Sequence, residues 1–394
     1  YTDKRLTQNL IDFHKWVSSY NYINTGVALK LFLPNQKIVE ETYNIFLYAN
    51  KVDQRNFSQD KKKIFEFLSS GFKTKKEIIA KFKNKTSLFK TLIKNKLVFE
   101  RKRKDEIKNP ISLNQLNLKE LSFLQDKAYM EIKDKIAKKN KKPIFLDGVT
   151  GSGKTEIYFQ LIRDFLKEKK QVLILLPEIA LSEQWLKRFQ SSFGFYPMVW
   201  NSKIKISQKR KVWNAVLKKK SLVIVGARSS LFLPYVNLGL TIIDEENDQS
   251  YKQEEGVIYN ARDMAISRAS FENIPVNLIT AVPSIETYEN IKKKKYMISK
   301  LEKRYQDASL PNHEIINLNK VKLDKQSWLS SEIIKKVNTH LENRNQVLFF
   351  LNRRGFSPNV FCKKCLNKFA CPNCSINLVY HKNKNNLLCH YCGF

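Results

Sequence analysis

The chain has 394 residues, enough for two to four domains that each bury a core of their own. Lys and Arg number 71 against 37 Asp and Glu, and the formal charge of +34 favours a polyanionic partner, of which nucleic acid is the commonest. A general richness in lysine and asparagine accounts for part of this excess. No apolar run approaches the roughly 18 residues of a membrane span, and no signal peptide is visible, so we expect no membrane partner.

Residues 1–55 carry apolar side chains at helical spacing but no visible chemistry, and we interpret this stripe as packing. The pattern of residues 56–108 predicts three short helices, for which Ser58 and Thr74 are candidate N-caps. A short strand and a basic segment follow, which is typical of a winged-helix module that reads DNA with a helix and a wing. A spacer domain with a solvated, charged face is the alternative. The predicted elements are helices at Lys61–Leu68, Lys75–Phe82 and Ser87–Lys94, a strand at Leu97–Glu100, and the basic run Arg101–Lys104.

Between residues 113 and 300, short apolar runs alternate with longer amphipathic segments. Such alternation predicts an α/β domain with a parallel sheet and helices on both faces. A second α/β unit begins within residues 301–394, and a cysteine-rich stretch interrupts it from about residue 360. The predicted strands of the first unit are Ile144–Leu146, Val172–Leu176, Leu222–Val225, Leu240–Ile243 and Val276–Ile279. The predicted elements of the second unit are a helix from about Trp328 to Asn343 and a strand at Val347–Leu351.

Residues 148–155 fit the pattern G-x-x-x-x-G-K-[ST] between a predicted strand and a predicted helix. Glycines let the backbone wrap a phosphate, and the helix N-terminus adds positive potential. Lys154 would reach the β- and γ-phosphates, and the Thr155 hydroxyl would take a place on Mg²⁺. Asp244 and Glu245 end a buried-strand run, where a metal ligand and a general base are needed. We therefore predict a site for a nucleoside triphosphate; a glycine-rich turn without a ligand is the alternative.

Two further segments follow predicted strands at the carboxyl edge of the sheet, where ligands bind in open α/β folds. These are residues 173–181 (LILLPEIAL) and 226–229 (GARS). Nucleic acid lying across this edge would contact both. The polar residues 248–263, with two tyrosines and several basic side chains, are suited to stacking bases and to reporting DNA occupancy to the ATP site.

All six cysteines lie between residues 362 and 392, in C-x-x-C pairs. Such clustering indicates metal binding in a reducing compartment rather than a disulfide framework. Cys371, Cys374, Cys389 and Cys392 have the spacing of a structural zinc ribbon, in which four thiolates leave no open position on the metal. Cys362 and Cys365 supply only two ligands, so a second zinc needs further ligands beyond Phe394 or from a histidine.

The segments GVTGSGKTEIY, LLPEIALS, GARSSLFLP, DEENDQSYKQEEG, PSIET, FFLNRRGFSP and CPNC…CHYCG occur in this order. In this order they resemble the PriA family of primosomal replication-restart helicases, over roughly residues 5 to 394. The resemblance implies a RecA-like P-loop helicase lobe, preceded by a winged helix and followed by the start of a second RecA-like lobe with an inserted four-cysteine zinc ribbon. It assigns residues 1–55 to the tail of an N-terminal DNA-binding domain and a linker.

The resemblance also implies function: a superfamily 2 motor that hydrolyses ATP with Mg²⁺ and moves 3′→5′ on single-stranded DNA. It implies recognition of abandoned forks and loading of the replicative helicase through primosome proteins, with single-stranded-DNA-binding protein and the helicase loader as partners. The expected location is the bacterial cytoplasm, at the nucleoid. A second zinc, on Cys362 and Cys365, would be completed by ligands in the intact protein, since the family pattern makes this chain a fragment truncated at both ends.

Site residues follow from the same motifs. Lys154, Asp244 and Glu245 would be catalytic, and Gln125 would read the adenine. DNA contacts would come from Arg228 on the backbone and from the coupling loop. The predicted cofactor residues are Gln125, Gly148, Thr150, Gly151, Ser152, Gly153, Lys154, Thr155 and Asp244, and the coupling-loop residues are Tyr251, Lys252, Tyr259 and Arg262.

The chain departs from the family pattern at the positions that couple hydrolysis to DNA. Asn247 stands where the family has histidine, and it does not titrate near neutral pH. Val282 replaces a threonine, and Val257 and Ile258 replace a tryptophan and an arginine. We therefore predict retained ATP binding with weakened DNA coupling, and no unwinding by this fragment alone. The alternatives are a DNA-binding module with a vestigial ATPase and a P-loop ATPase that acts on protein or small molecules.

Overall fold

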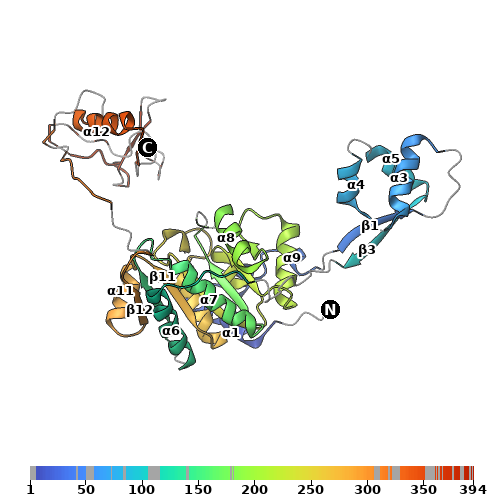
Figure 1. Ribbon diagram of the computed structural model, residues 1–394, viewed down its shortest axis with the longest axis horizontal. Coiled ribbons are helices and arrows are strands. Elements are labelled where there is room, and N and C mark those ends of the chain that lie inside the picture. Colours follow the sequence, from blue (N-terminus) through green and yellow to red (C-terminus); the bar gives the residue numbers. More distant parts are fainter. Residues whose placement is uncertain are drawn as a thin grey trace. The chain divides into compact units, whose positions relative to one another are not determined.

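The computed structural model falls into two units, residues 1–309 and 310–394, which are described separately (Figure 1). The residues that the structure describes are 6–40, 43–49, 57–71, 73–82, 86–104, 116–138, 142–177, 180, 182–305, 311–317, 320–321, 329–350, 360, 362, 364–365, 367–374, 377–381, 386–389, 392 and 394.

A seven-stranded sheet forms the centre of the first unit, in the order β12-β4-β11-β8-β5-β7-β6 with every neighbouring pair parallel. Along β5, Val172 and Ile174 pack into one hydrophobic cluster, while Leu173 and Leu175 pack into another. Both faces of the sheet are therefore buried, which is why its strands read as continuous apolar runs. The strands are β4 (Ile144–Gly148), β5 (Gln171–Leu175), β6 (Met198–Trp200), β7 (Val223–Gly226), β8 (Leu238–Asp244), β11 (Val276–Thr280) and β12 (Met297–Leu301).

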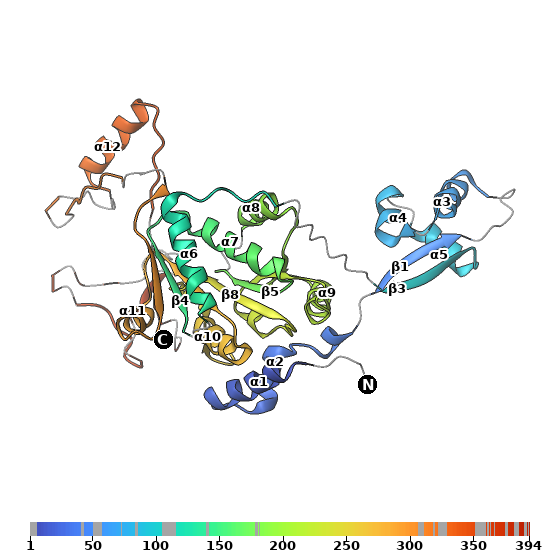
Figure 2. The same cartoon turned by 60° about the horizontal axis from the view of Figure 1, so that its bottom comes forward.

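Helices cover both faces of this sheet, as the alternating pattern predicted (Figure 2). All five predicted strands form, and β6 and β12 are added at the two edges, where short or lysine-containing segments gave no apolar run. The helices are α6 (Phe123–Ala137), α7 (Lys154–Lys167), α8 (Glu183–Phe193), α9 (Ile206–Leu217), α10 (Ala261–Glu272) and α11 (Ile285–Lys292). Short elements are η3 (Arg228–Phe232), η4 (Gln249–Tyr251), β9 (Lys252–Gln253) and β10 (Tyr259–Asn260).

The N-terminal helices α1 (Gln8–Tyr20) and α2 (Thr25–Phe32) pack on the same core. Phe13 stacks on Phe232 with ring centroids 6.1 Å apart, and Nδ2 of Asn214 donates to O of Glu40, just after η1 (Gln36–Val39), at 2.9 Å. The apolar stripe is thus packing, as predicted. Residues 8–39, which the family resemblance assigned to a tail and linker, contribute buried side chains such as Leu10, Phe13 and Phe32 to the core of this unit.

A small module between residues 43 and 104 combines three helices with an antiparallel sheet in the order β2-β1-β3. The three helices and the strand after them match the winged-helix prediction, and Thr74 forms the predicted cap, a capping box with Glu77. The basic residues 101–104 lie within β3 and pair with β1 rather than following the strand. Strand β1 lies N-terminal to the expected boundary at residue 56. The elements are β1 (Tyr43–Ala49), α3 (Gln59–Ser69), β2 (Lys73–Thr74), α4 (Lys75–Lys81), α5 (Thr86–Lys94) and β3 (Val98–Lys104).

The second unit contains α12 (Ser331–Glu342) and a hairpin of β13 (Val379–His381) and β14 (Asn386–Leu388). The helix agrees with the prediction, with Ser330 as its N-cap. Residues 347–350, predicted as a strand, have no strand structure, and Leu348 and Phe350 are 90% and 83% exposed. A strand forms only where a neighbour pairs with it, and no described strand does so here.

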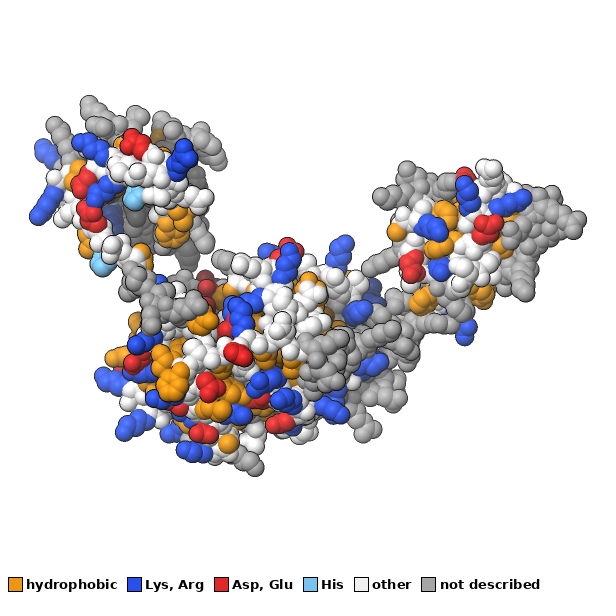
Figure 3. All heavy atoms as spheres, in the orientation of Figure 1, with side chains coloured by type: hydrophobic (Ala, Val, Ile, Leu, Met, Phe, Trp, Pro, Cys, Tyr) orange, Lys and Arg blue, Asp and Glu red, His pale blue; other side chains and the backbone are white. Residues whose placement is uncertain are grey.

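On the face drawn in Figure 3, the described positive charge is spread rather than concentrated. Figure 3 shows Lys and Arg side chains scattered over the visible face with Asp and Glu among them. This distribution agrees with a partly compositional origin of the charge of +34. Among the described residues, no helix is both long and apolar enough to span a membrane.

Candidate functional site

The loop between β4 and α7 has the shape that a phosphate group requires. Gly151 and Gly153 have φ values of +81° and +82°, in the left-handed region that strains any residue with a side chain. A Cβ at Gly153 would lie 2.2 Å from Nε2 of Gln125. A Cβ at Gly148 would lie 2.8 Å from the side chain of Lys154. These glycines therefore permit a backbone path that leads directly into the N-terminus of α7.

Polar groups converge inside this loop. The hydroxyl of Ser152 is buried and has no hydrogen-bond partner among the described residues. Nζ of Lys154 donates to O of Gly148 at 2.8 Å, so the ammonium group lies within the curve of the loop. Thr150 and Thr155 line the same cavity. A buried hydroxyl without a partner and a cation at a helix N-terminus fit a bound phosphate.

Gln125 joins α6 to the phosphate loop. Its Oε1 accepts from the backbone of Ser122 at 2.9 Å, and its Nε2 donates to O of Ser152 at 2.9 Å. The side chain is 2% exposed. The amide is thus largely occupied by protein partners and retains one N–H. Reading of an adenine by Gln125 stays a prediction, to which the structure adds a second role, the positioning of the loop.

Asp244 ends β8 and Glu245 follows it, at the same edge of the sheet. Burial, followed by the charge of Glu245, raises the pKa of Asp244 to about 6. Its carboxylate accepts from the hydroxyl of Tyr158 at 3.1 Å and from the backbone of Glu245 at 3.0 Å. Glu245 has a φ of +47°, which is strained for a side-chain-bearing residue. Burial makes the Asp244 carboxylate costly to ionise, and its two hydrogen bonds leave room for further contacts. These properties suit a ligand of a divalent cation, whose charge would offset the cost of ionisation.

Asn247 joins this motif to β11. The hydroxyl of Thr280 lies 2.8 Å from Oδ1 of Asn247 and 3.2 Å from Oε2 of Glu245, so its one hydrogen serves either acceptor. The backbone of Val282 donates to the same hydroxyl at 3.3 Å, and the Val282 side chain is 65% exposed. The oxygen of the Asn247 amide thus helps to link the carboxylate motif at residues 244–245 to Thr280 at the end of β11.

Glu246 lies behind the motif in a buried network, the Glu246 cluster, which consists of Glu246, Arg262, Ser284 and Thr287. The Glu246 carboxylate accepts from Nη1 of Arg262 at 3.2 Å and from Oγ1 of Thr287 at 2.9 Å. It also accepts from the backbone and hydroxyl of Ser284, at 2.8 and 3.1 Å. The ion-paired side chains are 0% and 5% exposed. The cluster fixes the carboxylate motif to the starts of α10 and α11, and sequence patterns gave no signal for it.

The residues predicted to contact DNA divide into two groups. Tyr251 and Tyr259 are 1% and 5% exposed, and the Tyr251 hydroxyl lies 2.6 Å from O of Asp244. Arg262 is held in the Glu246 cluster. The side chain of Lys252 is 60% exposed, and Arg228 donates to the carbonyl of Lys252. The structure thus brings the five residues together around the β9–β10 hairpin but leaves only Arg228 and Lys252 at the surface. Direct DNA contacts by the buried three stay a prediction that requires the hairpin to open.

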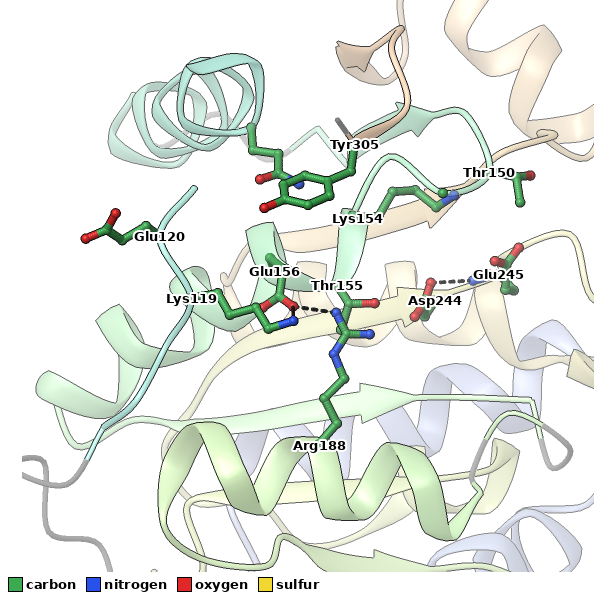
Figure 4. Close-up of a pocket in the computed structure, with 13 residues that line it drawn as sticks. Lys119, Glu120, Thr150, Lys154, Thr155, Glu156, Arg188, Asp244, Glu245 and Tyr305 are labelled. Carbon is green, nitrogen blue, oxygen red and sulfur yellow. Dashed lines mark hydrogen bonds and ion pairs between the residues drawn. The ribbon is translucent and has the colours of Figure 1, made fainter. Parts of the chain in front are cut away.

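The phosphate loop and the carboxylates line one cavity of about 400 Å³ (Figure 4). Residues at its other end were not predicted. Glu156 directly follows the phosphate-loop pattern, and the others belong to no quoted motif and come from separate segments. Nη2 of Arg188 donates to Oε1 of Glu156 at 2.6 Å. The unpredicted lining residues are Lys119, Glu120, Glu156, Arg188 and Tyr305.

Four cysteines in the second unit form a cluster. The sulfur atoms of Cys371, Cys374, Cys389 and Cys392 all lie within 4.8 Å of one another. Cys371 and Cys392 are 3.5 Å apart, and Cys374 and Cys389 are 3.3 Å apart. Four converging thiolates match a closed tetrahedral Zn²⁺ site, as the spacing predicted. Cys362 and Cys365 are outside the metal-binding group found among the described residues, so their site stays a prediction.

A phosphate loop after one strand of a parallel sheet, with Asp-Glu at the end of another, defines a P-loop nucleotide-binding lobe, an architecture that helicases share with other ATPases. The family model "DEAD/DEAH box helicase" matches residues 124–291. Among solved structures, the Hef helicase domain of Pyrococcus furiosus matches with 17% identity and a TM-score of 0.33, over 44% of this chain and 38% of that chain.

The cysteine-rich region distinguishes the family within this class. The family model "PriA DNA helicase Cys-rich region (CRR) domain" matches residues 371–394. The replication restart protein PriA of Rickettsia felis is 51% identical over 259 residues, which cover 66% of this chain and 40% of that protein. PriA of Chlamydia trachomatis is 33% identical over 419 residues, which cover 100% of this chain and 54% of that protein. The chain belongs to the PriA family of replication restart proteins, and it spans about half or less of the length of these relatives.

Proposed function

We propose that this chain is the ATP-binding part of a 3′→5′ DNA helicase that recognises stalled or abandoned replication forks and initiates primosome assembly. The observation that carries the proposal is the cavity in which the phosphate loop, Asp244 and Glu245 face one another. Membership of the family supports the fork and primosome roles. The proposed partners are single-stranded and forked DNA, other primosome proteins, single-stranded-DNA-binding protein and the replicative helicase loader. The proposed location is the bacterial cytoplasm, at the nucleoid.

Each residue has a defined task in this proposal. The backbone of residues 150–153 and the ammonium of Lys154 hold the phosphates of ATP, and the Thr155 hydroxyl and Asp244 hold Mg²⁺, which neutralises phosphate charge when bound. Glu245 orients the attacking water and accepts its proton, and the hydroxyl of Thr280 positions Glu245. Catalysis of this kind depends on positioning and charge neutralisation. The four-cysteine Zn²⁺ site is structural, and a second zinc would bind Cys362 and Cys365 in the intact protein.

ATP hydrolysis by the intact protein, with and without a forked DNA that carries a single-stranded gap, tests the proposal. We expect DNA-stimulated turnover that Lys154→Ala abolishes. Turnover that survives this substitution would place hydrolysis elsewhere and contradict the assignment.

A second candidate is a fork-binding module whose ATPase is vestigial, because Asn247 and Val282 stand in the segments that link the carboxylates to β11. Fork binding without any turnover would favour it.

Under the leading proposal, coupling to DNA is weak. The oxygen of Asn247 accepts from Thr280, but asparagine lacks the ionisable ring that the family has at this position. We expect less than tenfold stimulation of ATP hydrolysis by single-stranded DNA, and a larger stimulation in Asn247→His. Stimulation of tenfold or more in the unsubstituted protein would contradict this expectation.

A further inference from the structure

The cavity has two ends of different chemistry (Figure 4). Lys154, Asp244 and Glu245 lie toward one end, where the phosphates and the cation would bind. Tyr305 and Glu120 lie toward the other end, away from the carboxylates. Since the proposed ATP extends from its γ-phosphate beside the carboxylates, its base points to the end that Tyr305 lines. This inference rests on the proposed nucleotide site and adds a determinant of its specificity.

Tyr305 is fixed against the phosphate loop by the backbone rather than by its side chain. Strand β12 pairs with β4, with Leu301 opposite Gly148, so the chain after β12 runs beside the loop. The N–H of Val149 donates to O of Leu301 at 3.2 Å, and the N–H of Tyr305 donates to O of Gly151 at 3.0 Å. The Tyr305 side chain remains 49% exposed. An aromatic ring that is anchored at its own backbone and open on the cavity side is suited to stacking.

The opposite rim carries two cationic side chains beside one buried carboxylate. Arg188, on α8, is held by the 2.6 Å bond to Glu156, whose side chain is 10% exposed. Nζ of Lys119 lies 3.9 Å from the same carboxylate oxygen. In Figure 4, Tyr305 lies on one side of the cavity and the Arg188 guanidinium on the other. A flat, uncharged ring system fits between an aromatic face and a guanidinium plane.

We propose that Tyr305 stacks on the base of the bound nucleotide and supplies a base-dependent part of its affinity. The ligand class is a purine nucleoside triphosphate, because a purine offers the larger face for stacking. The contact lies beyond the motifs, in the segment that follows the last strand of the sheet.

Calorimetric titrations with Mg²⁺ and either ATP or inorganic tripolyphosphate test this contact, because tripolyphosphate has the phosphates but no base. In Tyr305→Ala we expect the Kd for ATP to rise about 5- to 160-fold, the loss typical of one base–aromatic stack. The Kd for tripolyphosphate should change less than about twofold. Tyr305→Phe keeps the ring and should bind ATP as the unsubstituted protein does. Tyr288→Ala, at a 59% exposed position on α11 outside the cavity, is the matched control and should change neither Kd.

Two results would overturn the proposal. An unchanged Kd for ATP in Tyr305→Ala would show that the ring makes no contact, and an equal rise for both ligands would show that the residue only supports the phosphate loop. Lys154→Ala separates this inference from the proposed function, since it should weaken both ligands. If the unsubstituted protein binds neither ligand, the nucleotide site itself fails, and the inference fails with it.

Discussion

Glu246→Gln is a substitution whose cost follows from the geometry of the Glu246 cluster. Oε1 of Glu246 accepts from the backbone of Ser284, and Oε2 accepts from Arg262, Thr287 and the Ser284 hydroxyl. Glutamine offers one acceptor oxygen and one amide group that only donates. Whichever way the amide is turned, at least one buried donor faces another donor, and Arg262 also loses its buried counter-ion.

Removal of one partner from a buried ion pair costs about 3–5 kcal/mol where the other charge is left without compensation. Arg262 keeps its bond from Nε to Asp263 at 2.8 Å, so the lower end of this range, about 3 kcal/mol, applies here. We therefore expect the free energy of unfolding of the lobe to fall by about that amount. Urea denaturation followed by tryptophan fluorescence measures it, since Trp16, Trp185, Trp200 and Trp213 all lie in the first unit.

Glu289→Gln is the matched control on α11. Its Oε2 lies 3.7 Å from Nζ of Lys293, and the two side chains are 43% and 62% exposed. Exposed ion pairs contribute about 0–1 kcal/mol, because water solvates either charge when the other is removed. We therefore expect the free energy of unfolding to fall by about 1 kcal/mol or less. Equal losses in the two variants would refute the reasoning, since the number of buried donors would then not set the cost.

Three further substitutions or treatments have expected outcomes. Gly153→Ala should weaken ATP binding more than Gly151→Ala in a calorimetric titration. Both positions share the strain of a φ near +80°, but a Cβ at Gly153 would also lie 2.2 Å from Nε2 of Gln125, whereas a Cβ at Gly151 would have no protein atom within 4 Å. Equal losses would contradict the steric explanation. Removal of Zn²⁺ with a chelator should increase hydrogen exchange in residues 371–394, because these residues are held together by the thiolates rather than by a large core. The unfolding transition of the first unit should stay unchanged, and a destabilised first unit would contradict this expectation. In EDTA, Asp244→Asn should raise the free energy of unfolding at pH 8 by up to about 3 kcal/mol, since the pKa of Asp244 rises from 3.8 to about 6 on folding. A carboxyl group with a raised pKa stabilises the folded state only while it is protonated. In the unsubstituted protein this stabilisation is complete below pH 3.8 and is lost as the pH rises through about 6, so the gain in unfolding free energy from Asp244→Asn should vanish near pH 4. A gain from Asp244→Asn that does not depend on pH would contradict this reasoning.

Local patterns in the chain were sufficient for the chemistry of the phosphate end. The loop at residues 148–155 and the carboxylates at 244–245 each follow an apolar run, and parallel strands bring their carboxyl ends to one edge. The cysteine spacing likewise predicted the sulfur cluster, because two tight turns suffice to aim four thiolates at one point. The predicted strand at 347–351 did not form over its described residues, since strand formation depends on a neighbour that no local pattern encodes.

The sequence by itself determined the class of this protein, because nucleotide and zinc sites require particular residue types at fixed, short spacing. Only the tertiary structure placed Tyr251 and Arg262 in the interior, joined Glu246 to the starts of two helices, and brought Tyr305 beside Gly151. These contacts join segments far apart in the chain. Burial and packing decide them, and neither quantity is a property of a residue and its neighbours in sequence.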